Sequence, residues 1–167
     1  RMMLRGSVYH GQEEIQTNIA LNDVIITRAG FSRLVELKIY VNGELLSIYN
    51  ADGIIVSTPT GSTGYSLSAG GPIIFPQTDV MVITPICPHS LQARSLVVSG
   101  EDRIMIEIGR RRKTQKEEAM VTFDGRSAQE LETGDRIEIY KAQETTQLIR
   151  LKGRSFYQVL QNKIGTA

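Results

Sequence analysis

Strict alternation of apolar and polar residues, followed at once by a two-residue turn, is the feature that most limits what this chain can fold into. Residues 33–41 read RLVELKIYV, with Val, Leu, Ile and Val at every second position, which is the period of a strand with one buried face. Asn42-Gly43 follows directly, and this pair favours the hairpin turn in which both central residues need a positive φ. Residues 44–50 then form the expected returning strand. The sequence therefore predicts an antiparallel sheet.

Short β-type runs recur along the rest of the sequence, each bounded by Gly, Pro, Asp or Asn. Ile, Val and Thr, which are branched at Cβ and favoured in strands, make up 43 of the 167 residues. The further expected strands are 22–27, 53–57, 80–84, 95–99, 104–108, 120–123, 136–140 and 147–151. Helical signals are limited to 63–69 and to 156–164. We expect a mainly β fold, a distorted β-sandwich of many short strands with one short helix after the TPTGSTGY loop and a short C-terminal helix.

Charge and cysteine content exclude several classes of function. Lys and Arg total 19 against 18 Asp and Glu, a net charge of +1, so neither nucleic acid nor an anionic membrane is expected as a partner. The single cysteine rules out an internal disulfide, and no spacing of Cys and His predicts a metal site. No apolar run reaches the ~18 residues of a membrane span, and no signal-peptide pattern opens the chain. We therefore expect a soluble, cytoplasmic protein with one domain.

The most informative stretch is NADGIIVSTPTGSTGYSLSAGGP, at residues 50–72. A strand ends here in a small, polar loop that leads into a helix, an arrangement that presents backbone N–H groups to an anion or a nucleotide. Tyr65 offers a ring for a base, and Asp52 offers a carboxylate for a ribose diol. Four side chains add hydroxyls that donate and accept hydrogen bonds: Thr58, Thr60, Ser62 and Thr63. The same composition also describes ordinary turns and caps, and neither G-x-G-x-x-G nor a Walker A sequence occurs, so the residues alone leave both interpretations open.

Other polar residues have a simple structural interpretation. Cys87 is expected to be a buried, small apolar residue, and His89 to pack in a loop or at an interface. Asp124-Gly125 is interpreted as a turn between strands, with a contact to the site as the alternative. The charge run at 110–118 is interpreted as a solvated hairpin loop, with anion or polyphosphate binding as the alternative.

The stretch DGIIVSTPTGSTGYSLSAGGPII, together with ITPICPHSLQARSLVV downstream, resembles the C-terminal domain of the NAD kinase family. The short motif Asn22-Asp23, the segment VTFDG at 121–125 and the segment FYQVLQNK at 156–163 also resemble family segments. The resemblance covers essentially the whole chain. It implies an enzyme, a kinase that phosphorylates the adenosine ribose 2′-hydroxyl of NAD to make NADP. The phosphoryl donor would be ATP or polyphosphate, used with Mg²⁺ or another divalent cation.

The resemblance also implies which residues hold the substrate. Those expected to bind NAD are Asn22, Asp23, Asp52, Thr60, Thr63, Gly64 and Tyr65. Cys87 and His89 match a loop that approaches the dinucleotide of a neighbouring subunit, so a homodimer or homotetramer is expected. No residue of this chain is expected to be a dedicated metal ligand. Two departures from the family pattern stand out: Gly64 replaces the more usual Ala, and Arg150 lies where many bacterial members carry His.

One family motif, Gly-Gly-Asp-Gly, does not occur in this sequence. In the family it belongs to an N-terminal domain that binds the ATP phosphates and supplies the Asp that acts as general base. We therefore expect a fragment, with the NAD kinase C-terminal domain spanning 1–167, no catalytic residue of its own and no activity alone. A tail at 150–167 is expected to pack toward the missing domain. Two other functions stay open: a non-catalytic nucleotide-binding and assembly module, and a lipid kinase related to diacylglycerol kinases.

Overall fold

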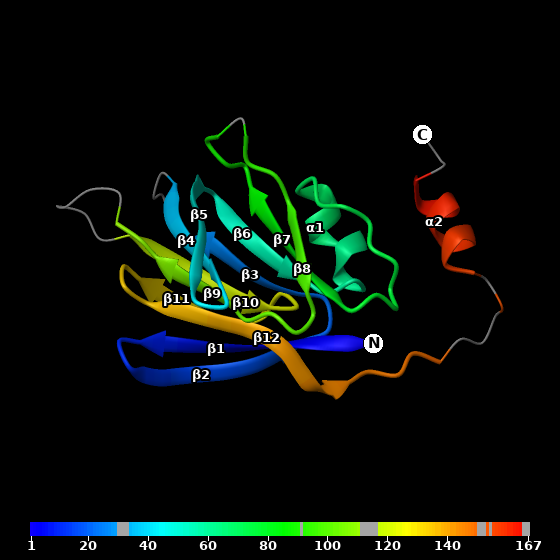
Figure 1. Cartoon of the computed structure of the whole chain (residues 1–167), viewed down its shortest axis with the longest axis horizontal. Helices are drawn as coiled ribbons and strands as arrows, with labels where there is room; N and C mark the ends of the chain where they lie inside the picture. The colour runs from blue at the N-terminus through cyan, green and yellow to red at the C-terminus, as the bar shows by residue number, and fades with distance from the viewer. Residues whose placement is uncertain (30–33, 91, 111–116, 150–152, 154, 165–167) are drawn as a thin grey trace.

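Two antiparallel sheets of six strands each pack face to face in the part of the chain that the structure describes (Figure 1). This computed structural model describes residues 1–29, 34–90, 92–110, 117–149, 153 and 155–164. Its architecture confirms the expected β-sandwich. The expectations for Arg150 and for most of the charge run at 110–118 lie outside the described residues.

The first sheet is built from β1 (Met2–His10), β2 (Glu13–Ala20), β4 (Val35–Val41), β5 (Glu44–Ala51), β9 (Ile104–Ile108) and β12 (Arg136–Thr145), in the order β2-β1-β12-β9-β4-β5. The second sheet is built from β3 (Asp23–Arg28), β6 (Gly53–Ser57), β7 (Val80–Ile86), β8 (Leu96–Ser99), β10 (Glu118–Phe123) and β11 (Arg126–Glu132), in the order β11-β10-β3-β6-β7-β8. The described helices are the 3-10 turn η1 (Gly61–Thr63), α1 (Tyr65–Ser68) and α2 (Phe156–Ile164). Both helices were expected at these places. None of these helices combines the length and the apolar character needed to cross a membrane.

Aliphatic side chains from the two inner faces form the core. In β4 the buried residues are Val35, Leu37 and Ile39, which alternate with half-buried Glu36 and Lys38 as the period of two predicts. The largest fully buried side chains come from both sheets: Leu4, Ile26, Leu37, Ile39, Ile54, Ile55, Met81, Ile83, Ile104, Ile106, Ile108 and Ile137.

Strand β6 differs from its neighbours because all five of its residues are buried. Its inner face lies against the first sheet, and α1 packs on its outer side (Figure 1). A strand covered on both sides reads as a continuous apolar run, which explains the GIIVS sequence. This packing places the loop after β6 on the outer face of the second sheet.

Two tight turns confirm the turns expected at Asn42-Gly43 and at Asp124-Gly125. Asn42 and Gly43 have φ values of 51° and 84°, and Asp124 and Gly125 have φ values of 50° and 69°. The residues that flank each turn pair across the strands, as Phe123 does with Arg126. Both turns therefore have the positive-φ geometry that Asn-Gly and Asp-Gly favour.

Three strands, β1, β2 and β11, were not expected, and one expected strand is not found. In β1, Gly6 interrupts the β-type sequence because the ring of Phe123 lies against it: a Cβ on Gly6 would lie 2.6 Å from Phe123 Cε1. β2 is an edge strand whose residues are mostly exposed, so its sequence is polar and lacks alternation. The strand expected at 147–151 is irregular over its described residues, 147–149.

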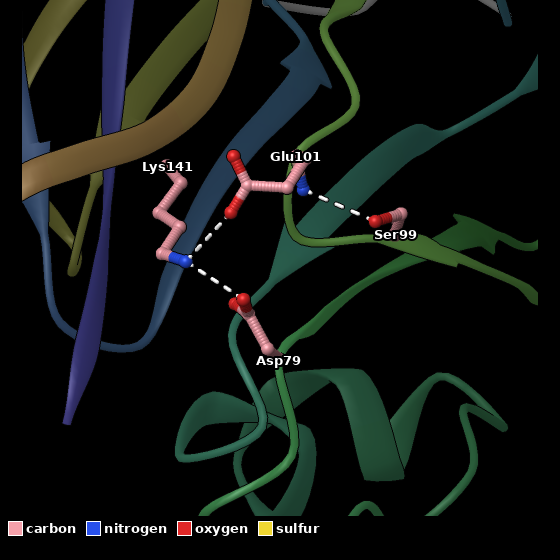
Figure 2. Close-up of polar contacts among 4 residues, drawn as sticks. All are labelled: Asp79, Ser99, Glu101 and Lys141. Atoms are coloured by element: carbon pink, nitrogen blue, oxygen red, sulfur yellow. Dashed lines mark hydrogen bonds and ion pairs between the residues drawn. The ribbon is translucent and has the colours of Figure 1, made fainter.

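One ionic cluster connects the two sheets. Lys141 Nζ, from β12, donates to Asp79 Oδ2 at 2.7 Å and to Glu101 Oε1 at 2.9 Å. Figure 2 shows the lysine between the two carboxylates, which lie just before β7 and just after β8. The three side chains are 34%, 52% and 78% exposed, so each ion pair contributes only ~0–1 kcal/mol to stability.

Candidate functional site

Two of the four hydroxyls in the loop after β6 make hydrogen bonds to the backbone inside the protein. Thr58 Oγ1 donates to the Leu21 carbonyl at 2.7 Å. Ser62 Oγ donates to a carbonyl of its own loop at 2.7 Å and accepts from a nearby backbone N–H at 3.0 Å. Both residues are fully buried, so they shape the loop. Thr60 and Thr63 are only half-buried, which leaves them as the hydroxyls within reach of a ligand.

Gly61 allows this loop to lie directly against Asn22. A Cβ on Gly61 would lie 2.0 Å from the Asn22 carbonyl oxygen, a distance that no side chain tolerates. The same carbonyl accepts from Thr58 N at 2.9 Å. At Gly64, by contrast, an added Cβ would lie 3.2 Å from its nearest neighbour, and φ is −97°. The more usual Ala at position 64 therefore requires the Gly61 carbonyl to shift by a few tenths of an ångström, far less than the shift an Ala at position 61 would require.

Asp124 holds the Asn22-Asp23 corner from the opposite side. Its Oδ1 accepts from Asn22 N at 2.7 Å and from Asp23 N at 3.1 Å, and its Oδ2 accepts from Leu21 N at 2.7 Å. Its own N–H donates to the Asp23 carbonyl at 3.0 Å. The turn expected at Asp124 is confirmed, and its carboxylate also contacts the backbone of two predicted site residues.

Asp23 is a buried carboxyl in an unusual setting. The residue is 6% exposed, and among the described residues no donor bonds its carboxylate. Burial, and secondly the charge of Asp124, raise the pKa of Asp23 to about 6. A buried acid with a perturbed pKa marks a candidate functional site. Asp23 is therefore suited to accept a hydrogen bond from a polar ligand.

Six of the predicted residues lie at the carboxyl-terminal end of β6, after Ser57. We call them the loop-end cluster: Asn22, Asp23, Thr60, Thr63, Gly64 and Tyr65. Tyr65 is 45% exposed at the first position of α1, so its ring is open to solvent. The loop does not act as a helix N-terminus toward an anion, because η1 and α1 have only three and four residues. The N–H groups of Ser62 and Gly64 donate inside the loop, to carbonyls at 2.9 and 2.8 Å.

Asp52 lies at the other end of β6. This strand runs from Gly53 to Ser57, and Ser57 is the residue that pairs with Asp23. Five steps along a strand, at roughly 3.3 Å each, place the Asp52 backbone roughly 16 Å from Ser57. The structure therefore does not bring Asp52 together with the loop-end cluster.

Instead, Asp52 lies beside the loop predicted to reach a neighbouring subunit. Arg28 Nε donates to Asp52 Oδ1 at 2.8 Å, and Asp52 N donates to the Ile86 carbonyl at 3.0 Å. Next to it, His89 N donates to the Asn50 carbonyl at 2.9 Å. We call Arg28, Asp52, Cys87 and His89 the Asp52 cluster. Arg28 was not singled out from the sequence, because a single Arg at the end of a strand carries no local signal.

The expectation that Cys87 is buried is wrong. Cys87 is exposed, with a φ of 45°. Strand β7 ends at Ile86, and the chain then turns sharply, so the side chain leaves the sheet for solvent. Exposure on this turn suits a contact outside the chain better than a role in the core.

Neither cluster contributes a residue to a cleft of about 780 Å³ that lies elsewhere on the molecule. This cleft is lined by Arg1, Met2, Lys141, residues 76–79 and residues 145–148. Among the described residues, no group of three or more His, Cys, Asp or Glu side chains is placed to hold a metal ion.

Comparisons with known proteins agree on one family. The model of the ATP-NAD kinase C-terminal domain matches residues 21–151. A protein named NAD kinase from Lachnoclostridium phytofermentans is 50% identical over 99% of this chain, and one from Lachnospira eligens is 47% identical over 98%. The chain spans 59% of the length of each.

Two solved structures share the fold. Yeast NADH kinase complexed with NADH matches 85% of this chain and 40% of its own, with a TM-score of 0.77 and 35% identity. An NAD kinase from Archaeoglobus fulgidus in complex with ATP matches 86% of this chain and 52% of its own, with a TM-score of 0.69 and 27% identity.

Proposed function

We propose a function from one premise: this chain belongs to the NAD kinase family. Within that family, we assign it the part of the enzyme that holds NAD while the 2′-hydroxyl of its adenosine ribose receives a phosphoryl group, giving NADP. This membership removes the reason to consider a lipid kinase. The chain covers 59% of its relatives' length, so phosphoryl transfer itself is assigned to the longer protein.

The observation that supports this assignment best is the setting of Asp23. Its buried carboxylate lacks a donor among the described residues, and it lies next to exposed Asn22. A ribose hydroxyl would supply the missing donor, and a bond to a charged acceptor contributes about 1.5–3 kcal/mol. Tyr65, on the same cluster, would lie against adenine through its exposed ring.

The chemistry divides between this chain and the rest of the enzyme. Phosphoryl transfer depends mostly on positioning and on electrostatic stabilisation, and the loop-end cluster would do the positioning. ATP or polyphosphate would enter with Mg²⁺ or another divalent cation, held through substrate phosphates. The general base would come from the Gly-Gly-Asp-Gly domain of the family, so this chain alone would bind NAD without phosphorylating it.

We assign the Asp52 cluster to the NAD site of a second copy of the chain. It lies at the far end of β6 from the loop-end cluster and includes the exposed turn at Cys87. In a two-fold dimer, each site would combine the loop-end cluster of one copy with the Asp52 cluster of the other. This arrangement would explain why one short motif supplies residues to both ends of a strand.

We also propose that the tail at 150–167 packs against the rest of the enzyme. On either side of its start, Leu148, Ile149, Tyr157 and Val159 are 52%, 87%, 69% and 42% exposed. The edge-to-face contact between Phe75 and Phe156, with ring centroids 5.3 Å apart, attaches α2 to the sandwich. Tyr157 also stacks on Phe75, with ring centroids 6.0 Å apart. Leu148, Ile149 and Val159 would supply apolar surface for contact with another part of the protein.

Complementation between copies tests the shared site. NAD binding is measured by calorimetry on the protein as its gene encodes it. Asn22→Ala and Asp52→Asn should each weaken binding, by about ten- to a hundredfold for Asp52→Asn, and Tyr65→Ala should also weaken it. When Asn22→Ala and Asp52→Asn copies are mixed and reassembled in equal amounts, about a quarter of the sites should regain wild-type affinity.

Two results would contradict the proposal in different ways. Wild-type protein that does not bind NAD would refute the function. Mixed copies that recover no high-affinity sites, although each variant alone is impaired, would refute the division of the site between two copies.

A further inference from the structure

We infer that Asp124 is a positioning residue for NAD: its carboxylate fixes the backbone of Leu21, Asn22 and Asp23, and so sets where the Asn22 and Asp23 side chains meet the ribose. This inference rests on the proposed function. Asp124 itself would not touch the substrate, because its carboxylate is already engaged with three backbone N–H groups.

Hydrogen bonds hold both the N–H groups and the carbonyl groups of the backbone around Asn22. On the N–H side, the two Asp124 oxygens accept from three consecutive residues at 2.7, 2.7 and 3.1 Å. On the carbonyl side, Thr58 donates through its hydroxyl to Leu21 and through its N–H to Asn22, at 2.7 and 2.9 Å. Bonds to an ionised acceptor are about twice as strong as neutral ones. The peptide of Asn22 therefore has one defined orientation before any ligand arrives.

The turn itself does not require a carboxylate. The other Asx-Gly turn, Asn42-Gly43, has nearly the same φ values and uses an amide side chain. There, Asn42 accepts from Arg103 N at 2.9 Å and donates to Asp102 at 2.8 Å. At position 124 three backbone N–H donors converge, so the side chain must supply acceptors and no donor. An amide at this position would point its own N–H donor at one of the three N–H groups.

The placement has an electrostatic consequence for the site. Asp124 is the charged group whose field adds to burial in raising the pKa of Asp23. The two carboxyls stay close because the Asp124 N–H donates to the Asp23 carbonyl at 3.0 Å. The bonds to Asp124 thus order the corner, and the Asp23 carboxylate stays available to accept from a ligand donor.

The test is Asp124→Asn, with Asp135→Asn as the matched control, in the protein as its gene encodes it. Asp135 is a turn carboxylate too, and it is buried where Asp124 is half-buried: it accepts from Glu132 N at 2.9 Å and bonds His10 Nδ1 at 2.7 Å. Glu132 pairs with Glu118, at the end of β10 away from Asn22. Both variants should lower the melting temperature. We expect Asp124→Asn to raise the Kd and the KM for NAD about tenfold, with kcat and the KM for the phosphoryl donor changed less than twofold. Asp135→Asn should leave all four constants within twofold.

A purely structural role predicts a different pattern. If Asp124→Asn lowers the amount of active enzyme but keeps the wild-type KM and Kd for NAD, the inference is wrong. If wild-type protein does not bind NAD, the proposed function fails before this question arises. Should Asp124→Asn not fold, Asp124→Ser retains one acceptor oxygen and takes its place. In either variant, the amides of Leu21, Asn22 and Asp23 must exchange with solvent faster than in the wild type, and unchanged exchange would overturn the inference.

Discussion

Replacing Gly61 with alanine is the sharpest perturbation that the candidate site offers. The new Cβ would lie 2.0 Å from the carbonyl oxygen of Asn22, 2.5 Å from its carbonyl carbon and 2.8 Å from its Cα. All three atoms are backbone, so no side chain can rotate away. The loop and the Asn22 corner must separate by more than 1 Å to reach an ordinary contact distance, on the order of 3.4 Å or more.

Two hydrogen bonds set the scale of the loss. The bond from Thr58 N to the Asn22 carbonyl, at 2.9 Å, and the bond from Thr58 Oγ1 to the Leu21 carbonyl, at 2.7 Å, both cross the gap that must open. Each contributes about 1 kcal/mol, and an overpacked contact adds about 1–3 kcal/mol. The free energy of unfolding should fall by roughly 3–5 kcal/mol. For a chain of this size that lowers the melting temperature by roughly 6–20 °C.

Gly64→Ala is the matched control with a smaller clash: its Cβ would lie 3.2 Å from the Gly61 carbonyl oxygen, and a shift of a few tenths of an ångström relieves that contact. Thermal unfolding followed by circular dichroism, and NAD binding by calorimetry, compare the two variants. Gly61→Ala should lose stability and bind NAD at least tenfold more weakly, whereas Gly64→Ala should stay close to wild type in both. Equal melting temperatures for Gly61→Ala and Gly64→Ala would show that the contact between the loop and Asn22 is not as tight as the structure has it.

Two further substitutions test the electrostatics. The pKa of Asp23 is about 6 in the folded chain against an ordinary 3.8, so its ionisation opposes folding above about pH 6 and costs nothing below about pH 4. Asp23→Asn should therefore raise the melting temperature at pH 8, leave it unchanged at pH 4 and weaken NAD binding. An equal shift of the melting temperature at both pH values would contradict the assignment. Lys141→Met removes the bonds to Asp79 and Glu101, and because these groups are at least one-third exposed the loss should stay below about 1 kcal/mol in urea unfolding; a loss of 3 kcal/mol would mean that the cluster is a main link between the sheets.

Local sequence patterns predicted most of the strands, because the burial of each strand's faces and the geometry of its turn determine which residues it carries. The alternation in β4, the Asn42-Gly43 turn and the all-apolar β6 each follow from the surroundings of a single strand. The local pattern does not predict β1, because Gly6 lies against the ring of Phe123, more than 100 residues away along the chain. A contact between residues so far apart is not visible in the neighbouring sequence. Cys87 was misjudged for a similar reason: its neighbours are apolar, and only the end of β7 decides that it faces solvent.

The site residues show the same limit in another form. Asp52 and Thr60 belong to one continuous motif, so the sequence suggests that they act together, and the resemblance assigned both to NAD. An extended strand, β6, lies between them, and it separates the backbones of Asp52 and Ser57 by roughly 16 Å. A motif that reverses direction gathers its residues, whereas a motif that runs along a strand distributes them to opposite edges of the molecule. The fold, not the spacing in the sequence, therefore determines which predicted residues lie together at one end of β6 and which lie at the other.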